Sequence, residues 1–120
     1  MKRKFPMLFS GIISLIMVFS ACEKVVFPPP DNSFPDNISY SNTIQPIWDS
    51  KCVSCHGGSK APDLRPNDSH GALTGGGYIN TSDPAESDLM LKLYGSHDSR
   101  ATQSEKTLIL GWITQGAKDN

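Results

Sequence analysis

Apolar residues recur at helical spacing in three parts of the chain between residues 44 and 116. The first predicted helix covers residues 44–52, where Thr43 is placed to cap the amino end. Pro46 then falls in the first turn, where its missing N–H costs little. The apolar face of this helix consists of Ile44, Ile47 and Trp48. Such spacing predicts an amphipathic helix that packs on a core.

The second predicted helix begins after Asp83 and ends at Gly95. Asp83 is placed to cap it, Pro84 occupies the first helical position, and Glu86 completes a pattern that resembles a capping box. Glycine favours a helix end because it readily adopts the backbone conformation that follows the last turn. The apolar face comprises Leu89, Leu93 and Tyr94.

The third predicted helix begins at Thr102, has Glu105 three residues later and ends at Gly116. Its apolar stripe comprises Leu108, Ile109, Trp112 and Ile113. No segment shows sustained strand alternation. Residues 56–82 are rich in glycine and are predicted to be mostly loop, with a single helical turn around residues 68–73. A loop of this length is unusual in a small domain and indicates that the segment wraps around a bound group.

The first 21 residues are predicted to be an export signal. Three positive residues precede an uncharged stretch over residues 5–19, and small residues follow at positions 20 and 21. This stretch of about 15 residues is shorter than the ~20 that a spanning helix needs. A retained membrane anchor is therefore the weaker interpretation.

Cys22 comes directly after this segment, and Phe19-Ser20-Ala21-Cys22 resembles a bacterial lipobox, with Phe19 in a position where leucine is usual. The resemblance implies that residues 1–21 are a lipoprotein signal peptide and that Cys22 carries lipid. The alternative is an ordinary secreted protein with a free thiol, which would be a liability in an oxidising compartment.

Residues 22–37 are predicted to be a tether between this cysteine and a domain over residues 38–120. The segment is rich in proline and includes Pro28-Pro29-Pro30, which favours an extended, stiff chain. At ~3.1 Å per residue it would hold the domain up to roughly 45 Å from a membrane. The alternative is that part of the segment packs onto the domain.

Charge and composition narrow the range of partners. The chain has a net charge of −1, and 38% of its residues are hydrophobic. It lacks the excess of Lys and Arg that nucleic-acid binding needs, so we expect no nucleic-acid partner. Without the leader, 8 Lys and Arg stand against 12 acidic residues, and the net charge of −4 weakly favours basic partner surfaces. Those 99 residues include 32 apolar ones, too few for a self-sufficient core.

The most informative stretch is Cys52-x-x-Cys55-His56, the pattern of c-type haem attachment. Two thiols at this spacing can form thioethers with the two vinyl groups of one porphyrin. The adjacent His56 is then held beneath the iron and supplies its proximal nitrogen. The motif therefore predicts one covalently bound haem c.

Two other sites use similar residues. A thioredoxin-like active site also contains a C-x-x-C pair, but it belongs to a βαβ context that this chain lacks. A zinc site needs a fourth ligand and usually a second ligand pair, and the sequence offers no such pair. Export also favours haem, because haem c is attached outside the bacterial inner membrane.

With this motif the sequence resembles a small single-haem cytochrome c of the kind found as bacterial lipoproteins, over residues 40–118. The segments that carry the resemblance are Ile44-Gln45-Pro46-Ile47, the motif at 52–56, Ala61-Pro62-Asp63-Leu64, Leu73 with Gly75-Gly76-Gly77-Tyr78, Ser87-Asp88-Leu89 and Trp112-Ile113-Thr114-Gln115-Gly116-Ala117. The resemblance implies an all-α, cytochrome c-like fold with three main helices and long loops around the haem. It also implies that the first and last helices pack together and that haem supplies the missing apolar surface.

The resemblance further assigns roles around the haem. The carbonyl of Pro62 would accept the Nδ1–H of His56 and so leave Nε2 for iron; the alternative is that Pro62 only turns the chain. Leu64 would pack on the ring edge, and Arg100 would pair with a propionate unless it is simply exposed. Two tryptophans would line or flank the cavity or pack in the core, namely Trp48 and Trp112.

The distal iron ligand is where the sequence departs from the family. Related domains usually place a methionine between the second and last helices, and residues 95–101 contain none. His97 lies in this segment and is the favoured ligand. Met90 follows, although a methionine at that helical position is most often core. An open site comes next, and His70, in a polar turn, comes last.

The predicted function is electron transfer by a mono-haem c-type cytochrome on the periplasmic side of a bacterial envelope, tethered to the bilayer through Cys22. We expect no enzyme activity, because the sequence contains no Ser/His/Asp triad or carboxylate pair. Partners would be redox proteins of the envelope. The alternatives are a peroxidase-like enzyme or gas binder with an open distal site, and a haem-bearing accessory subunit of an envelope complex.

Overall fold

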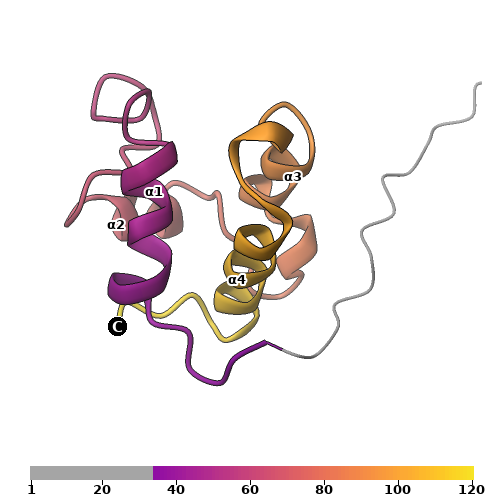
Figure 1. Cartoon of the computed structure of the whole chain (residues 1–120). Coiled ribbons are helices and arrows are strands. Elements are labelled where there is room, and N and C mark those ends of the chain that lie inside the picture. The colour runs from indigo at the N-terminus through magenta and orange to yellow at the C-terminus, as the bar shows by residue number, and fades with distance from the viewer. Residues whose placement is uncertain (1–33) are drawn as a thin grey trace, which may run out of the picture.

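The computed structural model describes residues 34–120, so the predicted signal peptide, Cys22 and the tether up to residue 33 lie outside the described residues. Residues 34–120 contain helices and loops and no strand, which confirms the predicted all-α class. Figure 1 shows α1 and α2 on one side of the domain and α3 and α4 on the other. Within the described residues, no helix is long and apolar enough to cross a membrane.

The first helical segment begins earlier than predicted. A π-helical turn, η1 (Tyr40–Ile44), leads directly into α1 (Gln45–Lys51). The side chain of Ser39 caps this segment by accepting a hydrogen bond from a backbone N–H three residues later. The prediction that Thr43 is the cap is therefore wrong, because Thr43 lies inside η1. Pro46 lies early in α1, as predicted.

The carboxyl end of the chain explains this earlier start. The side-chain oxygen of Asn120 accepts a hydrogen bond from Tyr40 N, and its backbone oxygen accepts one from Ser41 N, both at 2.9 Å. The first N–H groups of a helix need partners from outside the helix. Hydrogen bonds between the first helical turn and the last residue of the chain therefore determine where η1 begins.

The second predicted helix is broken in two. The chain forms a 3-10 turn, η2 (Pro84–Glu86), and then α3 (Asp88–Tyr94). Asp83 makes no side-chain capping bond, so the capping box predicted there is wrong. The break falls at Ser87, which is fully buried and has an extended backbone. The Ser87 hydroxyl accepts a hydrogen bond from Asn80 N at 2.9 Å, and this contact with the preceding loop interrupts the helix.

The last helix, α4 (Gln103–Thr114), begins as predicted. Thr102 and Glu105 each accept a hydrogen bond from the other's backbone N–H, so the capping box is confirmed. The helix ends two residues before the predicted stop, and Gly116 follows with φ +98°. Only glycine adopts that conformation without strain, so Gly116 marks the end of the helical backbone.

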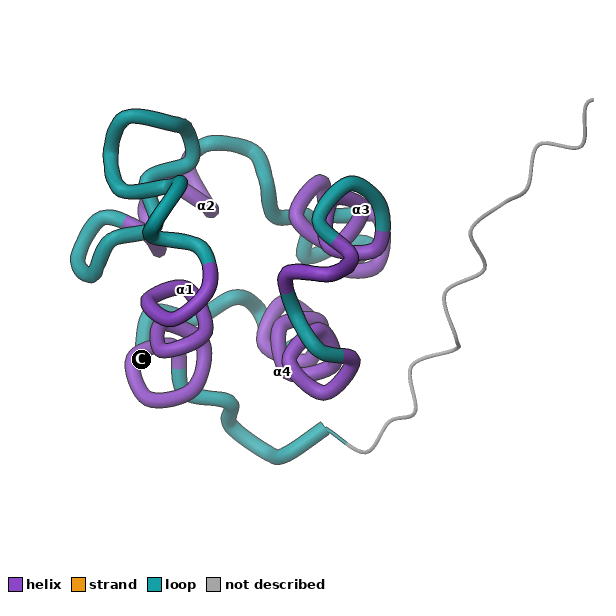
Figure 2. Tube along the Cα trace, turned by 45° about the horizontal axis from the view of Figure 1, so that its top comes forward, coloured by secondary structure: helices purple, strands orange, loops and turns teal. Residues whose placement is uncertain are grey.

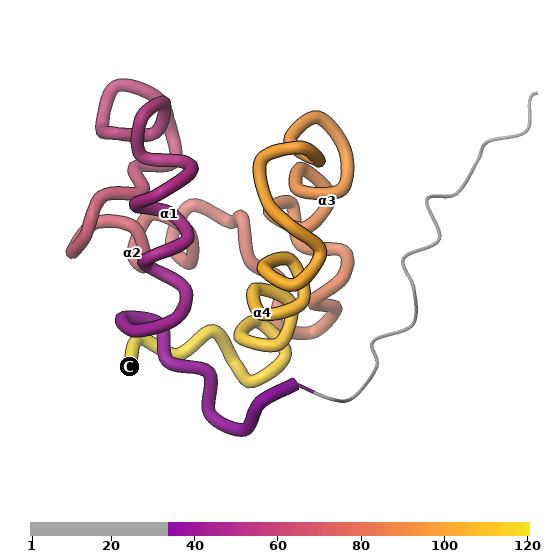
Figure 3. The backbone as a smooth tube through the Cα atoms, viewed as in Figure 1, coloured from indigo at the N-terminus to yellow at the C-terminus, as the bar shows by residue number. Residues whose placement is uncertain are grey.

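The glycine-rich middle of the chain is more helical than predicted. A seven-residue helix, α2 (Ser69–Gly75), replaces the single turn expected around residues 68–73. Figure 3 shows that the chain between α1 and α2 loops out at the end of the molecule remote from the C-terminus. This loop carries the cysteine and histidine motif.

The first and last helical segments pack together, as the resemblance implied. η1 lies against α4, and an ion pair of 2.9 Å between Lys51 Nζ and Glu105 Oε2 joins the end of α1 to the start of α4. Figure 2 shows α1, α2, α3 and α4 arranged around the centre of the molecule. The largest fully buried apolar side chains are Ile44, Trp48, Leu73, Met90, Ile109, Trp112 and Ile113.

The end of the predicted tether packs onto the domain. Gln115 donates from Nε2 to the carbonyl of Pro35 at 2.9 Å and accepts at Oε1 from the N–H of Ile38 at 2.8 Å. Phe34 and Ile38 lie so close to Gly111 of α4 that a Cβ there would come within 2.7 Å of Ile38 Cδ1. Residues 34–37 of the predicted tether therefore pack onto the domain, which is the alternative that the sequence left open for part of that segment.

Candidate functional site

The two cysteines lie where α1 ends. Cys52 is the carboxyl-terminal cap of α1, and the N–H groups of Cys55 and His56 both bond to its carbonyl, at 3.0 and 2.9 Å. Neither thiol is paired; Cys52 is half-buried and Cys55 is exposed. Burial raises the pKa of the Cys52 thiol, and the negative charge of Glu105 adds to this effect. Both thiols are thus held on one tight turn beside the histidine.

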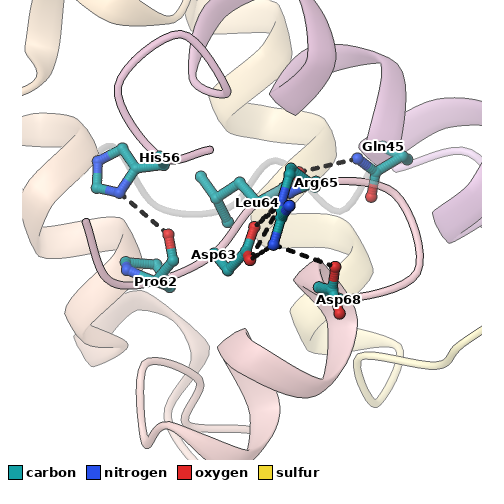
Figure 4. Close-up of polar contacts among 7 residues, drawn as sticks. All are labelled: Gln45, His56, Pro62, Asp63, Leu64, Arg65 and Asp68. Carbon is teal, nitrogen blue, oxygen red and sulfur yellow. Dashed lines mark hydrogen bonds and ion pairs between the residues drawn. The ribbon is translucent and has the colours of Figure 1, made fainter. Parts of the chain in front are cut away.

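Hydrogen bonds fix the orientation of His56. Its Nδ1 lies 3.1 Å from the carbonyl oxygen of Pro62 (Figure 4), which is the contact that the resemblance implied. The loop that presents this carbonyl is itself anchored, because Leu64 N donates to the His56 carbonyl at 2.8 Å and Gln45 Nε2 donates to the Leu64 carbonyl at 3.0 Å. An Asp63–Arg65 ion pair closes the turn beyond it.

Both cysteines and His56 face a cavity of about 380 Å³. This volume lies in the range of roughly 300–1,000 Å³ that ligand and cofactor sites occupy. The chain from α1 through the loops to α3 and η3 (Asp98–Arg100) contributes to its walls. The apolar and aromatic lining residues are Trp48, Ala61, Pro62, Leu64, Leu73, Tyr78, Leu89 and Leu93.

His97 faces His56 in this cavity. The two ring centroids are 6.3 Å apart and the ring planes are inclined by 46°. Nδ1 of His97 lies 3.0 Å from the hydroxyl of Ser96, just as Nδ1 of His56 is engaged by Pro62. No described residue is hydrogen-bonded to Nε2 of either ring. In both rings, Nδ1 therefore has a polar partner among the described residues and Nε2 has none.

The electrostatic surroundings of His97 favour its neutral form. Burial lowers the pKa of the imidazole, and nearby positive charges lower it further, those of His56, Arg100, Lys60 and Lys92. A neutral imidazole is the form that binds a metal ion. Among the described residues that line the cavity, four are cationic, namely Lys51, Lys60, Lys92 and Arg100, and none is acidic.

The other two candidates for the distal ligand lie away from the cavity. Met90 is fully buried in the core and does not line it. His70 packs edge-on against Tyr40 and Trp112, and its Nε2 lies 2.8 Å from the carbonyl oxygen of Ala117. His70 is therefore a structural residue that holds the C-terminal segment, rather than an exposed turn residue.

The two tryptophans occupy different places. Trp48 lines the cavity and is 1% exposed. Trp112 belongs to the core and donates from Nε1 to the carbonyl of Lys118 at 2.9 Å, without lining the cavity. Arg100 is exposed at the cavity and makes no ion pair with a described residue. Among residues 34–120, no group of three or more His, Cys, Asp or Glu side chains could hold a metal ion by itself.

Sequence patterns identified some of the lining residues and missed others. Leu89 and Leu93 belong to the predicted apolar face of the second helix, and their spacing of four places both on the cavity side of α3. Lys60 and Lys92 lie in segments whose local pattern gives no sign of a shared site. Only the fold brings them together.

Comparison with protein-family models, with curated proteins and with solved structures finds no match for this chain. The function of this protein is therefore inferred from the residues of the cavity alone.

Proposed function

We propose that this protein is a mono-haem c-type cytochrome that transfers electrons in a bacterial envelope. The observation that carries the proposal is the placement of the Cys52-x-x-Cys55-His56 motif on an apolar cavity in which His97 faces His56. Each histidine has its Nδ1 engaged and its Nε2 available. Nothing else in the described chain combines two thiols, two imidazoles and an apolar enclosure.

The residues present fit a haem group. Cys52 and Cys55 would hold it through thioethers, and the apolar lining would cover the porphyrin. Two imidazoles on opposite sides of one metal ion, with metal–nitrogen bonds of about 2.0 Å, have ring centroids roughly 6 Å apart. The separation of 6.3 Å between His56 and His97 agrees with that arrangement.

When bound, such a haem supplies a reversible one-electron couple. The chain's own residues determine how that couple behaves. Pro62 holds the tautomer and ring orientation of His56, and Ser96 is placed to do the same for His97. If His56 and His97 both hold the iron, the reduction potential would be lower than with a histidine and a methionine, because a thioether ligand raises it. This arrangement supports an electron carrier over a peroxidase-like enzyme or gas binder, which needs an open distal side.

Covalent attachment of haem tests the proposal directly. Thioethers survive unfolding, so we expect haem to remain with the polypeptide after denaturation, extraction with acidified acetone and electrophoresis. The native protein is expected to show a low-spin absorption spectrum in both oxidation states. Haem that is extracted from the chain would contradict c-type attachment, and a high-spin spectrum would favour the enzyme or gas-binding alternative.

We further propose that lipid on Cys22 attaches the protein to a membrane. This proposal is independent of haem binding, and Cys22 and the leader lie outside the described residues. Replacement of Cys22 by Ser removes the thiol to which lipid would be attached. We expect the haem protein to move from the membrane fraction into the soluble envelope fraction, because a lipid anchor contributes most of the membrane affinity. The measurement is the haem content of each fraction. Unchanged association would indicate a protein partner or an uncleaved leader.

A further inference from the structure

A charged side chain is buried on α4, close to the segment that carries His97. Lys106 is 4% exposed, and its ammonium group contacts two residues outside α4. Nζ donates a hydrogen bond to Oδ1 of Asp98 at 2.5 Å, and it lies 4.9 Å from the centroid of the Tyr94 ring. An ammonium within about 6 Å of an aromatic ring centroid is attracted to the face of the ring. We call Lys106, Asp98 and Tyr94 the Lys106 cluster.

The Lys106 cluster brackets His97 along the chain. Tyr94 is the last residue of α3, and Asp98 is the first residue of η3, directly after His97. One ammonium group on α4 therefore contacts the chain on both sides of residues 95–97.

Other contacts hold this segment weakly. Residues 95–100 are all exposed except His97, which is half-buried. The backbone N–H groups of His97 and Asp98 form hydrogen bonds within residues 92–98, so they do not attach the segment to another helix. Among residues 34–120, the contact between Lys106 and Asp98 is the only ion pair that joins residues 95–100 to another helix. A segment with few buried apolar contacts opens readily unless another contact holds it.

We infer that Lys106 is a positioning residue for the distal ligand, and that it holds the segment that presents His97 to the cavity. The inference rests on the proposed function, because it concerns the imidazole that would bind the iron opposite His56. Lys106 does not line the cavity, and it acts through its contacts with Asp98 and Tyr94. Its replacement would therefore loosen the hold on His97 without removing any group that touches the haem.

The exposure of Asp98 separates this role from a purely structural one. The Asp98 side chain is 67% exposed, so its carboxylate stays hydrated when its partner is lost. Lys106→Met removes the buried charge and leaves no buried charge unpaired, and such a replacement is often neutral or stabilising. We therefore expect Lys106→Met to keep or raise the melting temperature of the haem-loaded protein while it weakens the hold on His97.

Cyanide binding to the oxidised, haem-loaded protein measures the hold on His97. Cyanide binds the ferric iron only after His97 has left it, so the limiting rate constant at high cyanide concentration reports how fast His97 dissociates. Lys106→Met is expected to raise this rate constant about tenfold, because loss of a hydrogen bond to a charged group shifts a local equilibrium by roughly that factor or more. The measurement is stopped-flow absorption on the full-length protein in neutral detergent, and the spectrum before mixing is expected to stay low-spin.

Two further variants serve as controls. Ile113→Val shortens a fully buried side chain of the same helix that does not line the cavity. It is expected to lower the melting temperature and to leave the limiting rate constant unchanged. Adding Asp98→Asn to Lys106→Met is expected to change the rate constant by less than about twofold, because the pair is already broken.

The outcomes that would overturn the inference are distinguishable. Protein without haem, or a high-spin spectrum before any substitution, would remove the proposed ligation and the inference with it. Low-spin haem protein whose limiting rate constant is the same with Lys106→Met would contradict the inference alone, and a lower melting temperature in that variant would assign Lys106 a purely structural role. An equal rise in the rate constant with Ile113→Val would show that His97 responds to the stability of the whole domain rather than to Lys106.

Discussion

The double variant Cys52→Ala, Cys55→Ala is expected to lose the covalent haem that we propose and most of its folded structure. The cavity of about 380 Å³ is lined mainly by apolar side chains, and without haem these side chains face water or an unfilled space. Because exposed residues also line this cavity, the main loss is apolar surface that haem would have covered and that now stays in water, at about 25 cal/mol per Å². A small domain has only about 5–15 kcal/mol to lose.

Circular dichroism during heating measures this effect. The unaltered protein is expected to unfold in one cooperative transition and the double variant to show none, or to be degraded in the cell. Ser54→Ala is the matched control, because Ser54 lies between the two cysteines and is exposed. A double variant that melts cooperatively near the unaltered protein would mean that the helical core is self-sufficient.

The variant His97→Ala is expected to convert the haem spectrum from low-spin to high-spin. His97 is the imidazole that faces His56, with ring centroids 6.3 Å apart, and alanine would remove the second protein ligand of the proposed haem. Absorption and electron paramagnetic resonance spectra report the change directly. His97→Met is expected to restore a low-spin spectrum at a higher reduction potential if the thioether reaches the iron, because sulfur raises the potential.

Two controls separate ligation from stability. Met90→Leu replaces a fully buried core residue with one of similar size, so it is expected to cost less than about 1.5 kcal/mol and to leave the spectrum unchanged. His70→Ala removes the contact with the Ala117 carbonyl, so it should lower the melting temperature and keep the spin state. If Met90→Leu is the variant that turns high-spin, Met90 is the ligand and His97 is only a loop residue.

The parts of the fold that were predicted correctly depend on residues close together in the chain. The capping box of α4 involves Thr102 and Glu105, three residues apart, and its geometry follows from helical periodicity alone. The Cys52–Cys55–His56 spacing likewise places three groups on one turn at the end of α1. Local patterns of this kind can be read from the sequence, and the distant ion pair between Lys51 and Glu105 leaves the capping box intact.

The incorrect helix boundaries have a common cause. Thr43 and Asp83 are both good capping residues by local pattern, yet neither caps a helix. Asn120 supplies partners that let η1 begin before Thr43, and the buried Ser87 bonds to Asn80 and breaks the segment that Asp83 would have capped. A hydrogen bond from a distant segment satisfies helix-end groups as well as a local cap does, so tertiary contacts override the propensity.

Local patterns were sufficient to predict the all-α class, the capped final helix and the placement of Cys52, Cys55 and His56 on one turn, since each depends on neighbours within a few residues. Only the tertiary structure placed His97 across the cavity from His56, removed Met90 and His70 from it, and gathered Lys60, Lys92 and Arg100 at its mouth. Residues 56–60 and 90–100 are far apart in the chain, and their local patterns do not indicate which side chains will meet; only the resemblance favoured His97. Their proximity follows from the packing of α1, α3 and the loops between them. Burial of apolar side chains drives this packing, and the polar side chains on the same segments are brought together as a result.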